Sequence, residues 1–369
     1  MERYREAAAS SSSSRFLPFV SLPPEISGPM NLFELTRALV DIESTTNREQ
    51  NVADFLFAQL SSLAARTSGR LERIAVEANR DNIFASWGDP IVTLSTHMDT
   101  VPPFFPSLED GECIWGRGSC DAKGIIAAMI AAAEKLLDSG MTNFGLLFVV
   151  GEERDSAGAK VAAANPRGAR FLINGEPTEN RLALGSKGAL RFEVTAHGKL
   201  AHSAYPELGH SAIHSLLDVL RAIRSITLPE DPLLGPCTLN IGTIAGGRAP
   251  NVVADHAQAE IMFRTVGDPA EIREAVLAAT AGRAEVREVL HTPAMRLSAF
   301  DGLPTTVVAF ATDIPTFNGA WGEPFLIGPG SIHLAHTAEE RIPKAQLTEA
   351  VEIYARMARQ LLATGAARA

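Results

Sequence analysis

The chain has 369 residues, of which 46% are hydrophobic and 21% are charged, and its formal net charge is −10 at pH 7. This length allows two domains or one large domain, and this composition excludes a largely disordered chain. The net negative charge disfavours nucleic acids and anionic membranes as partners, because both bind basic surfaces.

Cysteine usage and hydropathy indicate in which cellular compartment the protein is expected. The three cysteines, Cys113, Cys120 and Cys237, include no CxxC pair, so we expect neither a disulfide framework nor a thiolate zinc cluster. No apolar run is long enough to cross a membrane. We therefore expect a protein of the reducing cytoplasm.

The first 29 residues differ from the rest of the chain. They are rich in serine and then in proline, and the prolines interrupt any apolar core of the kind that a signal peptide needs. We interpret residues 1–29 as a disordered extension. Asn31 is a suitable N-cap for the helix that we predict directly after it, at "LFELTRALVDI".

Between residues 31 and 184, helical patterns alternate with apolar runs. The predicted helices after the first are "EQNVADFLFAQLSSLA", "AKGIIAAMIAAAEKLLDSG" and a short one near "SAGAKVAAA"; the predicted strands are "NIFASW", "IVTLST", "FGLLFVV" and "ARFLING". Continuous apolar strands separated by helices indicate a mostly parallel sheet covered by helices. We interpret residues 31–184 as the first part of an α/β domain.

The pattern changes at about residue 185. The strand "GALRFEVTAHG" alternates apolar and polar residues, as a half-exposed antiparallel strand does. A helix, two strands, a second helix and a strand follow, so that the order is that of a split βαβ sandwich. We therefore predict an inserted α+β domain at residues 185–294, and a second part of the α/β domain at residues 295–369.

Ionisable residues follow the apolar runs. Two histidines and five carboxylates stand directly after predicted strands or in the loops beyond them: His97, Asp99, Asp121, Glu152, Glu153, Glu176 and His336. The carboxyl ends of parallel strands meet at one edge of a sheet, where open α/β folds place their chemistry. Carboxylates gathered there without matching lysines or arginines would repel one another, and a cation removes the conflict. Oxygen and imidazole ligands favour zinc, manganese or cobalt over calcium.

The number of candidate ligands predicts two ions. If each ion takes one histidine and one terminal carboxylate and a third carboxylate bridges them, five residues form two sites with three ligands each. Glu152 and Glu153 should point to opposite sides of an extended strand, so one can ligate while the other acts as a base on metal-bound water. Asp99 shares a face with His97 and can orient its imidazole.

Each of these residues also has an ordinary alternative. An isolated His97 would more often be a buried structural histidine, and Asp121 could cap the alanine-rich helix. His333 competes with His336, but the spacing from "GPG" and the following "TAEE" favour His336 as the ligand and His333 as a surface residue. Cys120 is best explained as a small packing residue.

Five motifs together resemble a known family. "STHMDTVP", "GRGSCDAKG", "GEERDSAGA", "NGEPT" and "GPGSIHLAHTAEE" are similar, in order and spacing, to those of the acetylornithine deacetylase, succinyl-diaminopimelate desuccinylase, aminoacylase and carboxypeptidase family of dinuclear zinc hydrolases. "GKLAHSAYPELGHSAI" and "GGRAPNVVADHAQAEIMFRT" resemble its inserted lid and dimerisation domain. The resemblance covers essentially residues 31–365.

The resemblance implies a role for each candidate residue. It assigns His97 and Glu176 to one metal, Glu153 and His336 to the other, and Asp121 to the bridge. It makes Glu152 the general base and acid, with Asp99 orienting His97. The remaining implied roles belong to the lid and to a glycine loop. His202, supplied by a partner subunit, polarises the scissile carbonyl, and Arg264 binds the substrate α-carboxylate. Asn240 lies near the same substrate-binding site, and Gly330 lets the backbone approach the substrate.

We therefore predict an amidohydrolase that holds two divalent ions, zinc first and cobalt or manganese as alternatives. Its expected reaction is hydrolysis of an N-acyl amino acid, as in acetylornithine deacetylases, by a hydroxide that bridges the two metals. A carboxypeptidase or di/tripeptidase with the same site is the alternative, and a metal-binding protein without turnover is the third possibility. We also expect a homodimer formed through the lid, with a small N-acyl amino acid or short peptide as substrate.

Overall fold

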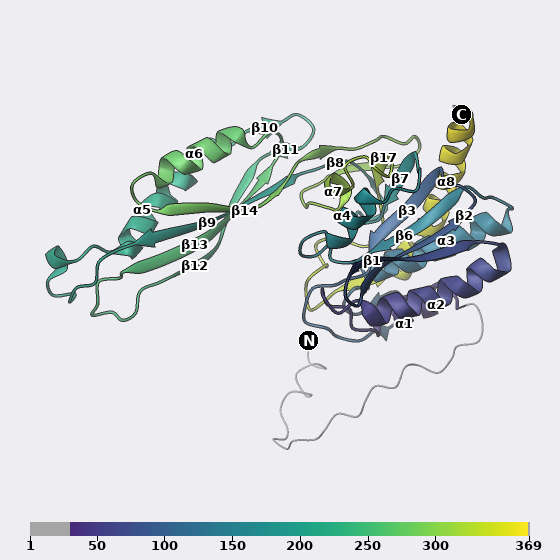
Figure 1. Ribbon diagram of the computed structural model, residues 1–369, viewed down its shortest axis with the longest axis horizontal. Coiled ribbons are helices and arrows are strands. Elements are labelled where there is room, and N and C mark those ends of the chain that lie inside the picture. The colour runs from purple at the N-terminus through teal and green to yellow at the C-terminus, as the bar shows by residue number, and fades with distance from the viewer. Residues whose placement is uncertain (1–29, 368–369) are drawn as a thin grey trace, which may run out of the picture. The chain divides into compact units, whose positions relative to one another are not determined.

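The computed structural model describes residues 30–367 (Figure 1). The extension predicted at residues 1–29 lies outside this range and stays a prediction. Within the described residues, no helix is long and apolar enough to cross a membrane.

A mixed sheet forms the larger layer of the fold (Figure 1). Within residues 30–367 it has nine strands in the order β1-β2-β6-β3-β7-β17-β8-β15, with β16 also paired to β8. The strands are β1 Arg70–Glu77, β2 Arg80–Trp87, β3 Val92–His97, β6 Phe144–Val149, β7 Phe171–Asn174, β8 Leu182–Ser186, β15 Met295–Arg296, β16 Thr305–Val308 and β17 Glu323–Leu326.

The predicted parallel arrangement is confirmed at the centre of this sheet, whereas most strand pairs at its sides are antiparallel, the parallel pair of β16 and β8 excepted. Strands β6, β3, β7 and β17 are parallel neighbours, whereas β1 and β2, β2 and β6, and β8 and β17 pair antiparallel. The first antiparallel pair is a hairpin, because only two residues separate Glu77 from Arg80 and Asn79 takes a φ of +61° in the turn.

Helices cover both faces of the mixed sheet (Figure 1). The helices of this part are α1 Leu32–Val40, α2 Gln50–Thr67, α3 Lys123–Asp138, α4 Ala157–Ala164, α7 Ile314–Phe317 and α8 Lys344–Ala367. Helices α3 and α8 pack against each other and against β3, and α4 packs with α7 over a core that includes Phe84 and Leu147. Helix α3 is buried along most of its length, as its alanine-rich sequence predicts.

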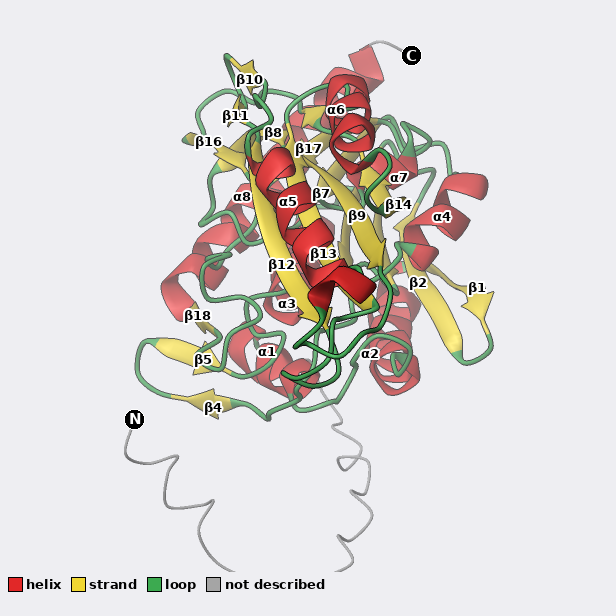
Figure 2. Ribbon diagram, turned by 90° about the vertical axis from the view of Figure 1, so that its left-hand side faces the viewer, coloured by secondary structure: helices red, strands yellow, loops and turns green. Residues whose placement is uncertain are grey.

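A separate antiparallel sheet follows the order predicted for residues 185–294. It consists of β9 Gly188–His197, β12 Thr238–Gly246, β13 His256–Thr265 and β14 Glu285–Thr292, in the order β12-β13-β9-β14. Helices α5 Ala212–Arg224 and α6 Ala270–Thr280 cover one of its faces, and Figure 2 shows α5 lying across it. The domain boundaries themselves stay a proposal.

Burial alternates along β13. Ala259, Ile261 and Phe263 belong to the core beneath the two helices. Met262 and Arg264 are half-buried and lie on the opposite face of the sheet. The helix-free face therefore carries polar and charged side chains, such as Gln258, Glu260 and Arg264, beside the apolar Met262.

A small three-stranded sheet connects two segments that carry site residues. Strand β5 Cys113–Trp115 pairs with β4 Leu108–Glu109 and with β18 Arg341–Pro343. Neither this sheet nor the short β10 Glu230–Asp231 and β11 Gly235–Pro236 pair was predicted. The pairing of β5 with β18 brings the loop before α3 next to the segment before α8.

Candidate metal centre

His97 and Asp99 lie at the end of β3. His97 is the last residue of the strand, and both side chains are buried. The Nδ1 atom of His97 lies 3.0 Å from the backbone oxygen of Asp99 and 3.5 Å from its carboxylate oxygen Oδ1. Asp99 therefore offers the imidazole two acceptors, and the nearer one is the backbone carbonyl rather than the carboxylate.

The carboxylate of Asp99 has further partners on two other segments. It accepts hydrogen bonds from the hydroxyl of Thr46 (2.8 Å) and from the backbone N–H groups of Glu152 (3.1 Å) and Glu153 (3.2 Å). Burial opposes its ionisation, but the hydrogen bond from His97 and its other partners outweigh burial and lower the pKa of Asp99. Asp99 thus fixes the turn that carries both glutamates against the end of β3.

Asp121 lies between two histidines that are far apart in the sequence. Its Oδ1 atom is 2.9 Å from Nε2 of His97, and its Oδ2 atom is 3.3 Å from Nε2 of His336. Burial raises the pKa of Asp121, but the hydrogen bonds from the two histidines outweigh this effect and lower it. Each carboxylate oxygen faces a different imidazole, as a carboxylate that bridges two ions requires.

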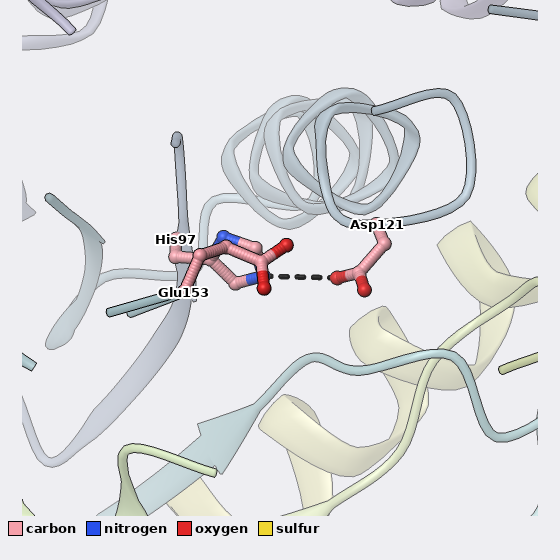
Figure 3. Close-up of side chains that lie close together, drawn as sticks. All are labelled: His97, Asp121 and Glu153. Carbon is pink, nitrogen blue, oxygen red and sulfur yellow. Dashed lines mark hydrogen bonds and ion pairs between the residues drawn. The ribbon is translucent and has the colours of Figure 1, made fainter. Parts of the chain in front are cut away.

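Glu153 pairs with His336. Its Oε1 atom lies 2.9 Å from Nε2 of His336, which sits in a turn with a φ of +64°. The hydrogen bonds to Asp121 and Glu153 raise the pKa of His336 to about 10, against the effect of burial. His97, Asp121 and Glu153 also form a group in which one ligand atom of each lies within 4.8 Å of the others (Figure 3).

Glu152 and Glu153 do not continue β6, which ends at Val149, but lie in the turn after it. The reasoning from strand alternation is therefore wrong at this point, because the backbone is not extended. The two side chains still differ in their surroundings. Glu153 faces His336, whereas burial and the neighbouring Glu176 carboxylate raise the pKa of Glu152 well above its usual value.

Glu176 follows β7 and is buried. Burial raises its pKa well above the usual value, and the charge of Asp121 adds to this effect while His97 opposes it. Its Oε1 atom accepts no hydrogen bond from the residues that the structure describes. A buried carboxylate oxygen without a donor is costly unless a cation lies beside it.

These observations fit a pair of divalent cations. Burial also raises the pKa of Glu153, and Asp121 adds to the effect, so the protein alone does not neutralise the glutamates of the site. Asp121 offers one oxygen to each histidine, and Glu176 offers an oxygen that accepts no hydrogen bond within residues 30–367. Imidazole nitrogens together with carboxylate oxygens are ligands that zinc, cobalt and manganese accept.

A cavity of about 570 Å³ opens onto this group. The candidate site residues that line it are Asp121, Glu152, Glu153, Glu176 and His336. Arg264, on the helix-free face of the small sheet, lines the same cavity. Burial lowers the pKa of Arg264, and within residues 30–367 it forms no ion pair with a carboxylate. The cavity therefore combines a carboxylate-rich group with a guanidinium that has no carboxylate partner among the described residues.

Five predicted residues are not among the described residues that line this cavity: His97, Asp99, His202, Asn240 and Gly330. His202 lies in an exposed loop, where its Nδ1 atom accepts a hydrogen bond from the backbone N–H of Ala204. Asn240 is exposed on β12. Gly330 has a φ of +89°, and a Cβ atom there would lie 2.6 Å from Sγ of Cys120. Backbone conformation and packing therefore explain why a glycine occupies this position.

Further residues near the group were not predicted from the sequence. Thr46, which donates to Asp99, has no sequence signal because the two lie 53 positions apart. Asp313 is buried, and neither of its carboxylate oxygens has a hydrogen-bond partner among the described residues. Burial raises the pKa of Asp313 to about 6. Glu340, the last residue of the "TAEE" stretch, was not predicted to be a site residue.

The chain resembles known proteins along most of its length. Residues 93–360 match the family described as peptidase family M20/M25/M40. A peptidase M20 domain-containing protein of Schizosaccharomyces pombe is 42% identical over 338 residues, which cover 89% of this chain and 84% of that protein. A probable carboxypeptidase of Aspergillus flavus is 37% identical over 369 residues, which cover 87% of this chain and 85% of that protein.

The fold is also found among solved structures. Aminopeptidase PepT of Bacillus cereus has a TM-score of 0.72 at 21% sequence identity, covering 90% of this chain and 98% of that one. This likeness confirms the predicted combination of an α/β sheet with a separate antiparallel sheet. Together with the family match and the fungal relatives, it confirms the resemblance that the five motifs indicated. The chain belongs to peptidase family M20/M25/M40 and is a metallohydrolase.

Proposed function

We propose that this protein is a metal-dependent carboxypeptidase that removes the C-terminal residue of short peptides. The matching relatives named as probable carboxypeptidases support this peptidase alternative over the acetylornithine deacetylase first predicted from the sequence. The observation that carries the proposal is Arg264, a half-buried guanidinium that lines the cavity without a carboxylate partner among the described residues. Such a group suits the free α-carboxylate of a peptide.

The candidate ligands and Glu152 have separate proposed roles. His97 and Glu176 would hold one ion, Glu153 and His336 the other, with Asp121 shared. When bound, these ions, which we propose to be zinc, supply an activated water and polarise the scissile carbonyl. Glu152 takes a proton from the attacking water and passes it to the amide nitrogen that leaves.

Arg264→Gln tests the proposed substrate. We expect kcat/KM for a peptide with a free C-terminus to fall about 10- to 100-fold, since a hydrogen bond to a charged group contributes about 1.5–3 kcal/mol. The same peptide with an amidated C-terminus should be a poor substrate for both proteins and should show little further loss. Steady-state kinetics on the two peptides measures the difference.

Arg287→Gln is the matched control, because Arg287 lies on the same sheet, is exposed and does not line the cavity. It should leave both rates unchanged. N-acetyl amino acids serve as the competing substrates. Turnover of these compounds without turnover of peptides would contradict the carboxypeptidase and restore the deacetylase.

We also propose that two copies of the chain form a homodimer through the inserted domain. His202 lies in an exposed loop and does not line the cavity of its own chain, and the family resemblance implies that this histidine acts in the partner subunit. His202→Ala should therefore lower kcat because the developing oxyanion loses a donor. Light scattering together with activity tests the assembly, and a fully active monomer would contradict it.

A further inference from the structure

The segment that carries His336 ends in a buried glutamate. Glu340 is 1% exposed and directly precedes β18. Its Oε1 atom accepts three backbone N–H groups, from Gly118 at 2.9 Å, Cys120 at 3.2 Å and Asp121 at 3.2 Å. Oε1 of Glu340 thus binds three backbone N–H groups of the irregular loop that ends at Asp121, the candidate bridging residue.

The other carboxylate oxygen completes a buried ion pair. Oε2 of Glu340 accepts a hydrogen bond from the guanidinium of Arg117 at 2.5 Å, and Arg117 is 2% exposed. The Nε atom of Arg117 donates to the backbone oxygen of Pro103 at 3.2 Å, and its guanidinium lies 4.9 Å from the centre of the Phe105 ring. Both charges of the pair are therefore satisfied, which a buried pair needs if it is not to be destabilising.

The contacts of Glu340 concern the loop that carries Asp121 and are more specific than a general stabilisation of the fold. The N–H of Asp121 itself is among the three donors, so Glu340 acts on the backbone from which the bridging side chain extends. The backbone oxygen of Glu340 also accepts from the N–H of Gly116, at the start of the same loop. Because His336 lies four residues before Glu340, one short segment positions both Asp121 and the histidine that faces its Oδ2 atom.

We propose that Glu340 is a positioning residue that sets Asp121 so that its two oxygens face His97 and His336 at once, and that it thereby determines the affinity for both ions. This inference rests on the proposed metal centre. Hydrogen bonds to a carboxylate are stronger than those to a neutral group, so a neutral residue at 340 should hold the loop less firmly. Asp121 is shared, so its displacement should weaken both ions together.

Glu340→Gln is the first test. We expect the affinity of metal-stripped protein for zinc, measured by calorimetry, to fall about 10- to 100-fold for both ions, as loss of a supporting residue typically does. At saturating zinc much of the turnover should return, with an unchanged KM for the peptide, because no substrate contact is altered. Glu339→Gln is the matched control, since Glu339 is the exposed neighbour, and it should change neither affinity nor KM.

A double variant separates positioning from folding. Arg117→Met with Glu340→Met removes both buried charges, a replacement that often preserves stability, but it also removes the acceptor for the three N–H groups. We expect this protein to fold, as judged by circular dichroism, and still to bind zinc weakly. If either Glu340 variant binds two ions with the affinity of the unaltered protein, the role of Glu340 is wrong. If the unaltered protein binds no zinc, the metal centre itself is wrong.

Discussion

Glu152→Gln is expected to lower kcat by about 10²–10⁴-fold while both ions stay bound, since this is the usual contribution of a general base. Glu152 lines the cavity, and Asp99 holds its backbone N–H next to the end of β3. Burial and Glu176 raise its pKa well above the usual value in the metal-free protein, so this carboxylate is suited to accept a proton. Glutamine keeps the shape of the side chain but cannot take up the proton.

Glu153→Gln provides the contrast for this experiment. Glu153 faces His336 at 2.9 Å and is a candidate ligand, so its loss should appear first as weaker metal binding. Kinetics together with the metal content of the purified proteins distinguishes the two roles. A Glu152→Gln protein that keeps nearly full turnover, or that loses its ions as Glu153→Gln does, would show that the base is assigned to the wrong residue.

The centre of the fold could be predicted because its strands are buried on both faces. Runs such as "IVTLST" and "FGLLFVV" are apolar throughout, and this pattern is typical of parallel strands covered by helices. Strand β1, "RLERIAVE", was missed because it lies at the edge and is largely exposed, so its charged residues hide the apolar ones. The antiparallel hairpin with β2 depends on this strand, which explains why the sheet was expected to be more parallel than it is.

The grouping of His97 and Glu153 followed from one topological rule, that parallel strands deliver their carboxyl ends to the same edge, whereas Asp121 reaches the group from the loop between β5 and α3. The conformation of each segment did not follow. Glu152 and Glu153 were placed on an extended strand, whereas they lie in a turn that Asp99 fixes through their backbone N–H groups. A contact of this kind depends on the packing of segments more than 50 positions apart, and no local pattern encodes it.

Supporting residues were harder to predict than candidate ligands. A ligand such as His336 stands out because its residue type is rare and its motif is distinctive. In the sequence, Glu340 cannot be distinguished from its exposed neighbour Glu339 in "TAEE". Only the pairing of β5 with β18 shows that Glu340 is buried against the loop that carries Asp121. Residues that act through the backbone of another segment therefore need the structure.

Asp121→Asn is expected to have the largest effect on metal binding, because its two oxygens face the two histidines of different candidate sites, at 2.9 Å from His97 and 3.3 Å from His336. An amide nitrogen cannot replace a ligand oxygen, so one ion loses its shared ligand and the other keeps only a neutral one. Affinity for both ions should fall by more than the about 10- to 100-fold expected for a supporting residue, and turnover should be lost.

Thermal unfolding with and without a chelator provides an independent measurement for Asp121→Asn. Ions that bind only the folded state raise its stability, so chelation should lower the Tm of the unaltered protein clearly. The Tm of Asp121→Asn should respond little, because few ions remain to be removed. Glu176→Gln should fall between the two, since Glu176 is a candidate ligand of one ion only. An Asp121→Asn protein that still binds two ions tightly, with a full Tm response to chelation, would contradict the shared carboxylate on which the proposed centre depends.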